Sequence, residues 1–275
     1  PAWAGEIPKE NTLPADSAID NYGKFVHKTV SYFKNKIKYW LGWGGEMDLA
    51  RRHIAEETKL PEKVINERII KIARTGYEEA KKADPDCIYQ ALTQPSGCDC
   101  QQGFPYSISL LGQGGQYTDA FIFDPYSNQR NLENGLPVES PERGNFAGCI
   151  ANALIVGKNK ICWIAEYGCA LSLNEKLNSP SAKKQADYLA RAYIIAASFP
   201  QIKFLQWFSM WPCVESKKFS YDLWRWPAPL PAVAVYSALG QFLTGVRNPR
   251  EITMPFFIKA YAFEKNNGSI AAVWT

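Results

Sequence analysis

The sequence has 275 residues, of which 46% are hydrophobic and 21% charged, and its formal net charge is +4. These proportions are typical of one globular domain of barrel size. Lys and Arg are mixed with Glu and Asp, which argues against a nucleic-acid partner, and no apolar run reaches the roughly 20 residues needed to span a membrane.

Seven cysteines and two histidines show no spacing typical of a metal site. Four of the cysteines lie in apolar runs and are expected to be small buried side chains, while Cys98 and Cys100 are expected in a loop. We therefore predict that no metal or other cofactor is required. The sequence leaves the cellular location open, and secretion or a periplasmic location is compatible with it.

The first half of the chain alternates amphipathic helical stretches with short apolar runs, which is typical of βα units and a parallel sheet. The predicted elements, in chain order, are a helix over residues 18–33 with a capping box at Ser17, a strand over 37–43, a helix from Pro61 to a stop at Asp84, and a strand over 87–92. Val64, Ile65, Ile69, Ile72, Ala73 and Ala80 form the predicted buried stripe of the second helix.

The second half continues the same alternation. It predicts a strand over residues 120–123, a helix over 145–156, a strand over 160–165, a helix over 183–198, a strand over 202–209 and a helix over 231–243 that Gly245 ends. After that helix the pattern changes to two apolar strands, 256–263 and 270–274, around an Asn267-Gly268 hairpin signal.

Five strands are clear in the βα part, and Trp3 could close a sixth. A closed (β/α)8 barrel needs eight strands, whereas a doubly wound open sheet could use five or six. No Gly-rich phosphate loop follows the first strand, so nothing favours a dinucleotide-binding fold.

Two carboxylates, Glu46 and Glu166, follow apolar strands at the ends where parallel-strand folds place their active sites. A retaining glycosidase needs two such groups, about 5–5.5 Å apart, one to attack the sugar and one to protonate the leaving oxygen. The alternative is that each Glu is an ordinary solvated or salt-bridged side chain without a catalytic role. Aromatic neighbours make an unpaired charge costly, which favours the catalytic role.

These segments resemble the clan A glycoside hydrolases, and family 39 with its family 5-like relatives most of all. Residues 163–168 (WIAEYG) look like the clan's nucleophile strand, and residues 37–46 (IKYWLGWGGE) are similar to its fourth strand. Residues 119–126 (DAFIFDPY) look like its sixth strand and residues 204–208 (FLQWF) like its eighth. The motifs match in order and spacing over about residues 1–245.

The resemblance implies an α/β fold of the (β/α)8 type over residues 1–247, N-terminally incomplete because Trp3 would end the third strand, and the start of a small β-sheet domain over residues 248–275. It implies retaining hydrolysis of an oligosaccharide or polysaccharide, with Glu166 as the nucleophile and Glu46 as the acid/base. Tyr126 would hydrogen-bond the nucleophile.

The remaining candidates are substrate contacts. The resemblance implies that Trp207 or Trp211 forms the floor of the sugar subsite, because C–H faces of sugars stack on Trp. Packing in the barrel core is an equal alternative for Trp207, while Trp211 precedes a Pro and is expected to be exposed. Trp43, which flanks Glu46, and Trp3 are further candidates.

The sequence departs from the family at two places. The fourth strand normally ends in Asn-Glu, but Gly44 and Gly45 precede Glu46, so a bulge is needed to keep Glu46 in register. Asp124 stands where the family often has His, either as a third active-site carboxylate or as a partner for Arg130. A carbohydrate-binding barrel that has lost its acid and an unrelated βα enzyme therefore remain alternatives.

Overall fold

A computed structural model of the chain describes residues 16–42, 59–92, 100–126, 146–158, 160–212, 219–255 and 258–275, with residues 100–106 described by their backbone only. The chain forms two compact units. The first comprises Pro1–Phe123 with Ala153–Cys162, and the second comprises Asp124–Asn152 with Trp163–Thr275.

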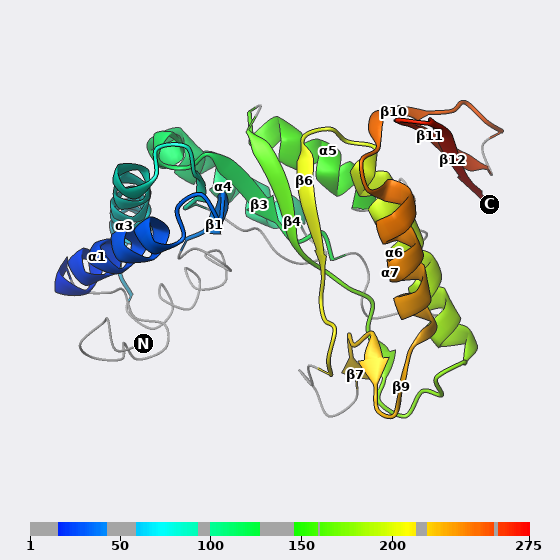
Figure 1. Cartoon of the computed structure of the whole chain (residues 1–275). Helices are drawn as coiled ribbons and strands as arrows, with labels where there is room; N and C mark the ends of the chain where they lie inside the picture. The colour runs from blue at the N-terminus through cyan, green and yellow to red at the C-terminus, as the bar shows by residue number, and fades with distance from the viewer. Residues whose placement is uncertain are drawn as a thin grey trace. The chain divides into compact units, whose positions relative to one another are not determined.

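The described residues of the first unit form these elements: α1 (Asp16–Tyr32), β1 (Tyr39–Leu41), α3 (Glu62–Ala83), β2 (Ile88–Gln90), α4 (Cys100–Gly114), the 3-10 turn η2 (Gly115–Tyr117) and β3 (Ala120–Phe123). Strands β1 and β2 pair in parallel, with Tyr39 opposite Ile88. Helices α1 and α3 lie side by side (Figure 1). The strand at residues 120–123 is the one predicted, while β1 and β2 have three residues each and are shorter than the strands predicted over 37–43 and 87–92.

The inner faces of α1 and α3 form the core of this unit. Five residues of the predicted stripe on α3 are buried, but Val64 is 43% exposed because it lies about 100° around the helix from Ile65. The predicted capping box is wrong as well, since α1 begins at Asp16 and Ser17 lies inside its first turn. At the centre, the hydroxyls of Tyr22 and Tyr89 share a buried hydrogen bond of 2.7 Å.

Helix α4 corrects the loop that was predicted around Cys100. Its sequence contains three glycines and a proline, which are poor helix formers, and the periodicity is correspondingly weak. Leu110 and Ser107 are nevertheless buried in it. Packing of this face in the folded chain outweighs the low propensity, which a sequence window does not contain.

Helix α5 (Phe146–Val156) and strand β4 (Ile161–Tyr167) cross the division between the units. The second unit continues with β5 (Leu171–Ser172), α6 (Pro180–Ala197), β6 (Ile202–Trp207), β7 (Phe219–Ser220), β8 (Trp224–Arg225), β9 (Ala228–Pro229) and α7 (Pro231–Leu243). Strands β3, β4 and β6 form a three-stranded sheet in that order, while β5 pairs with β7 and β8 pairs with β9.

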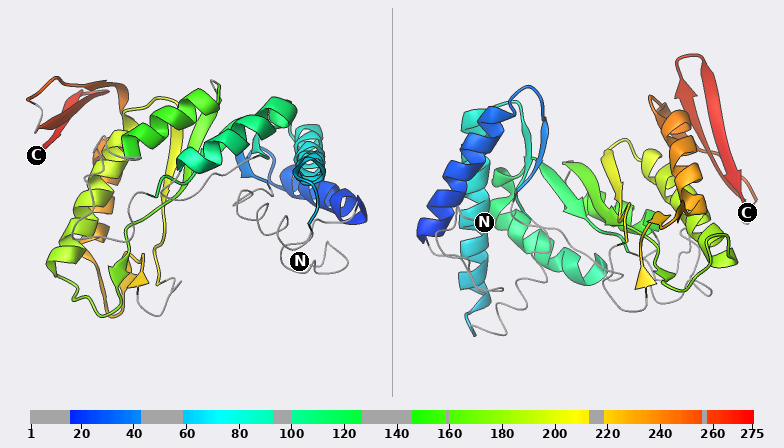
Figure 2. Two further views of the ribbon diagram at one scale, coloured as in Figure 1. Left: turned by 180° about the vertical axis from the view of Figure 1, so that it is seen from behind. Right: turned by 60° about the horizontal axis from the view of Figure 1, so that its bottom comes forward.

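Helices α6 and α7 lie side by side in each view of Figure 2 and pack on β6. The Ser179 side chain caps α6 by accepting the N–H of Ala182 at 3.1 Å, and a Pro occupies the first turn of each helix. Helix α7 has the predicted bounds, and Gly245 follows it with a φ of 75°, a left-handed conformation that favours glycine.

The chain ends in an antiparallel sheet of β10 (Arg247–Glu251), β11 (Lys259–Lys265) and β12 (Gly268–Trp274). The predicted hairpin is confirmed, with Lys265 opposite Gly268 and two Asn between them. The separate β domain from residue 248 and the closed eight-stranded barrel stay predictions. None of the helices in the described ranges is long and apolar enough to cross a membrane.

Candidate active site at the end of strand β4

Glu166 is the penultimate residue of β4, which places it at the strand end as predicted, although the strand continues two residues beyond the predicted bound at 165. Side chains of a strand alternate between its two faces, which puts Glu166 on the same face as the buried Ile164. Its side chain is half-buried. The apolar strand thus holds a carboxylate at its end, partly open to solvent.

Tyr126 orients this carboxylate. Its hydroxyl donates a hydrogen bond of 3.2 Å to Oε2 of Glu166, and only 8% of Tyr126 is exposed. Burial raises the pKa of the Tyr126 phenol far above its usual range, and the negative charges of Glu166 and Asp124 raise it further. The hydroxyl therefore stays protonated and acts as a donor to Glu166.

Asp124 holds the backbone at the same point. Its Oδ1 accepts the backbone N–H of Glu166 at 3.0 Å, and its own carbonyl accepts the N–H of Tyr126 at 2.8 Å. Asp124 is 1% exposed. One buried residue thus fixes both Glu166 and Tyr126, whereas Arg130, its alternative partner from the sequence, lies outside the described residues.

Gly168 allows the ends of β4 and β6 to meet. The N–H of Phe208 donates to the carbonyl of Tyr167 at 2.9 Å. A Cβ at Gly168 would overlap with the carbonyl oxygen of Phe208, which belongs to a cis peptide bond with Ser209. The close contact between Gly168 and the Phe208 carbonyl explains the Gly of the Glu-Tyr-Gly motif, because no larger residue fits at this position.

Tyr221 is a site residue that the sequence did not reveal. It lies in a buried cluster with Tyr126 and Ala170, and its ring contacts that of Tyr126 at 6.0 Å between centroids. Its carbonyl accepts the backbone N–H of Ser209 at 3.2 Å. Tyr221 follows no periodic pattern in the sequence, so only the folded chain brings it to the site.

The two candidate tryptophans at the end of β6 and just after it differ in their surroundings. Trp207 packs against Tyr167, with ring centroids 5.7 Å apart, and its indole N–H donates to the Tyr221 carbonyl at 3.4 Å. Trp211 is 63% exposed and contacts the ring of Trp224. The contacts of Trp207 are those of a packed side chain, and substrate binding by either residue remains a prediction.

Glu46, Trp43 and Trp3 lie outside the described residues, so the structure gives no separation between Glu46 and Glu166. In the described part of the chain, no three His, Cys, Asp or Glu side chains are arranged to hold a metal ion.

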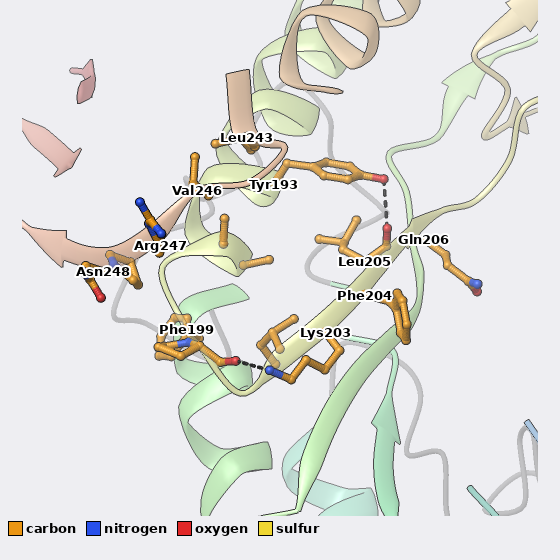
Figure 3. Close-up of a pocket in the computed structure, with 15 residues that line it drawn as sticks. Tyr193, Phe199, Lys203, Phe204, Leu205, Gln206, Leu243, Val246, Arg247 and Asn248 are labelled. Carbon is orange, nitrogen blue, oxygen red and sulfur yellow. Dashed lines mark hydrogen bonds between the residues drawn. The ribbon is translucent and has the colours of Figure 1, made fainter. Parts of the chain in front are cut away.

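A separate hollow of about 880 Å³ lies beside β6, which lines it from Ile202 to Gln206 (Figure 3). Tyr193, Lys203, Leu243 and Arg247 are among its lining residues, and the Tyr193 hydroxyl donates to the Leu205 carbonyl at 3.1 Å. None of the described residues that line it is a carboxylate. Glu166, Tyr126 and Asp124 are not among these lining residues, so the hollow is separate from the Glu166 site.

Comparison with solved structures identifies the fold. Xylanase 10B from Thermotoga maritima matches over 88% of this chain and 71% of its own, with 19% identity and a TM-score of 0.58. A family 39 glycoside hydrolase from Bacteroides cellulosilyticus WH2 matches over 95% of this chain and 52% of its own, with 16% identity and a TM-score of 0.65. β-Glucuronidase 2 from Bacteroides uniformis, covalently bound to cyclophellitol-6-carboxylate aziridine, matches over 96% and 35%, with 12% identity and a TM-score of 0.58.

No family model matches the sequence, and no curated protein matches it in a sequence search. The structural neighbours are barrel glycosidases, in agreement with the resemblance of the β4, β6 and β3 motifs. Although its sequence identity to these neighbours is low, the chain has the fold of the clan A glycoside hydrolases.

Proposed function

We propose that the protein is a retaining glycoside hydrolase that cleaves O-glycosidic bonds by double displacement, with Glu166 as the nucleophile. The observation that carries this proposal is the environment of Glu166. Its carboxylate accepts a hydrogen bond from Tyr126 and its backbone is held by Asp124, at a strand end of a glycosidase fold.

The chemistry follows from this arrangement. In the first step an oxygen of Glu166 attacks the anomeric carbon, the bond to the leaving oxygen breaks, and a glycosyl-enzyme forms. The carboxylate must be fixed for this attack, because holding the nucleophile in place lowers the entropic barrier. The Tyr126 hydroxyl and the Asp124 carboxylate supply that restraint.

The second carboxylate in this proposal is Glu46. It would give its proton to the leaving oxygen in the first step and take a proton from water in the second. Its assignment rests on the resemblance of residues 37–46 to the fourth strand of clan A enzymes. A distance of about 5–5.5 Å between the two carboxyl groups is required for this mechanism.

The substrate is proposed to be an oligosaccharide or polysaccharide. One structural neighbour is a xylanase, and another is a glucuronidase that carries a covalently bound aziridine inhibitor. These neighbours make xylan the first substrate to test and support an active site that can form a covalent bond.

Gly44 and Gly45 favour a second candidate function. They replace the Asn that clan A enzymes place before the acid/base Glu, and this loss removes a contact to the 2-hydroxyl of the sugar. A barrel that binds carbohydrate without cleaving it would fit this departure.

Hydrolysis followed by ¹H NMR separates the two functions. The retaining enzyme should release a sugar from xylan or from an aryl β-xyloside, and the anomer of that sugar that forms first should be β. Glu166→Gln should remove this activity. Glu251→Gln, an exposed residue on β10, is the matched control. Binding of xylan with no product from any of the substrates would support the non-catalytic alternative.

A further inference from the structure

Three tryptophans lie in the described part of the chain between β6 and α7: Trp211 contacts Trp224, and Trp226 is two residues beyond Trp224. Trp226 is 86% exposed and Trp211 is 63% exposed, while Trp224 is partly buried. A single exposed aromatic residue is ordinary on a protein surface, but several together are typical of a binding site. Each indole also offers a large apolar face beside a polar N–H group.

Trp224 packs against Trp211. Their ring centroids are 5.9 Å apart with a 55° angle between the planes, and the backbone N–H of Trp224 donates to the carbonyl of Met210 at 3.0 Å. Trp211 therefore contacts a partly buried ring on one side, although 63% of it is exposed.

Trp226 lies in the turn of the β8–β9 hairpin, which hydrogen bonds of Arg225 anchor. In the β8–β9 hairpin Arg225 lies opposite Ala228, which places Trp226 and Pro227 at the tip. The Arg225 guanidinium donates two hydrogen bonds, of 3.0 and 2.9 Å, to the buried carboxylate of Asp222. It also donates to the carbonyl of Ser172 at 2.7 Å, so the hairpin is tied to the segment after β4.

The same segment is continuous with the Glu166 site. The N–H of Leu223 donates to the carbonyl of Ser209 at 3.0 Å, and the N–H of Ser209 donates to the carbonyl of Tyr221. The Tyr221 ring packs on Tyr126, which holds Glu166. A chain-like ligand with one sugar ring at Glu166 would therefore extend along the same segment.

We propose that Trp211, Trp224 and Trp226 form a distal sugar surface that binds further pyranose rings of a β-linked oligosaccharide. The choice of ligand rests on the proposed function, because the continuity with Glu166 is what favours a carbohydrate over a protein partner. Pyranose rings with equatorial hydroxyls present apolar C–H faces, which stack on indole rings. A preordered surface binds at a low entropic cost, and the anchored hairpin provides one.

Affinity electrophoresis in soluble xylan, mixed-linkage β-glucan and glucomannan tests the surface without any need for catalysis. Wild type should be retarded by at least one of the three polysaccharides. Trp226→Ala and Trp211→Ala should each weaken that binding about tenfold, as expected when a central aromatic contact is truncated. Trp226→Tyr should keep most of it, because a flat ring remains.

Phe242→Ala is the matched control. Phe242 is 56% exposed on α7, next to Leu243, which lines the hollow beside β6. Removing an exposed aromatic residue there should leave polysaccharide binding unchanged. An equal loss in Phe242→Ala and Trp226→Ala would show a nonspecific effect and would overturn the proposal.

Hydrolysis assays separate this proposal from the catalytic one. Trp226→Ala should lower kcat/KM on a long oligosaccharide about tenfold and leave an activated aryl glycoside unaffected. If wild type binds polysaccharide through the tryptophans but hydrolyses nothing, the distal surface stands and the proposed hydrolase fails. Wild type that binds none of the three polysaccharides, or Trp226→Ala that binds them as tightly as wild type, overturns the distal surface.

Discussion

The Tyr126 hydroxyl donates to Oε2 of Glu166 over 3.2 Å, although 40 residues separate the two along the chain. The carbonyl and carboxylate of Asp124 fix both partners of this hydrogen bond. The pair is therefore positioned by a residue that directly follows β3.

Tyr126→Phe should lower kcat/KM about 10- to 100-fold, because a hydrogen bond to a charged group contributes about 1.5–3 kcal/mol. The ring remains and keeps its packing on Tyr221, so the free energy of unfolding at neutral pH should fall by no more than about 1.5–3 kcal/mol, the contribution of the lost hydrogen bond. Steady-state kinetics and urea denaturation measure the two effects. A loss of stability with unchanged kinetics would contradict a catalytic role for the hydroxyl.

The same variant has a defined pH dependence. The pKa of Tyr126 is raised in the folded protein, so above about pH 10 the unfolded chain releases a proton that the folded chain keeps. Wild-type stability should therefore fall above pH 10 more steeply than that of Tyr126→Phe, by about 1.4 kcal/mol per pH unit. Between pH 6 and 9 the difference between them should be constant.

Gly168→Ala should destabilise the protein by about 1–3 kcal/mol or more, because the new methyl group overlaps with the Phe208 carbonyl and forces β4 and β6 apart. Gly240→Ala is the control. Gly240 lies within α7 with no atom near the added methyl group, so this variant should gain about 0.5–1 kcal/mol from helix propensity. Urea denaturation that gives the two variants the same sign would contradict the packing described for Gly168.

Asp222→Ala should cost about 3–5 kcal/mol, because it leaves the Arg225 guanidinium without its buried partner. Burial raises the pKa of the Asp222 carboxyl, but the hydrogen bonds and charge of Arg225 outweigh burial and lower it overall. The stabilisation is therefore present above about pH 4 and is lost as the pH falls below that value. The exposed Asp187→Ala on α6 should change stability by less than about 0.5 kcal/mol.

Glu46→Gln should separate substrates by their leaving groups. A dinitrophenyl glycoside departs without a proton, so its first step should slow less than about tenfold, whereas an unactivated oligosaccharide should lose about 10²- to 10⁴-fold. Glu67→Gln, an exposed residue on α3, should change neither rate. Equal losses on both kinds of substrate would argue against the acid/base role.

The parts of the fold that a local pattern encodes could be predicted from the sequence. Helix α7 and strand β3 have their predicted bounds because their apolar runs are framed by Pro, Gly or polar residues. Helix α4 was missed because glycines and a proline obscure its period. Strands β5, β7, β8 and β9 have two residues each, which is too short for any alternation to be visible.

The candidate site divides in the same way. Glu166 was found because an apolar strand precedes it and Tyr-Gly follows, and the hydrogen bond from Tyr126 agrees with the role that the resemblance implied. The role of Asp124 as acceptor for the Glu166 backbone, the Tyr221 ring and the Arg225–Asp222 pair were not found. Their function arises from contacts between segments that no window of sequence contains.

Covalent trapping tests the central claim most directly. The protein is incubated with an activated 2-deoxy-2-fluoro-β-xyloside and, in parallel, with the corresponding glucoside, and the labelled peptide is sequenced by mass spectrometry. One fluoro-sugar per chain is expected, ester-linked to Glu166 and absent from Glu166→Gln. A label on another carboxylate, or active hydrolysis with inversion and no label, would contradict it.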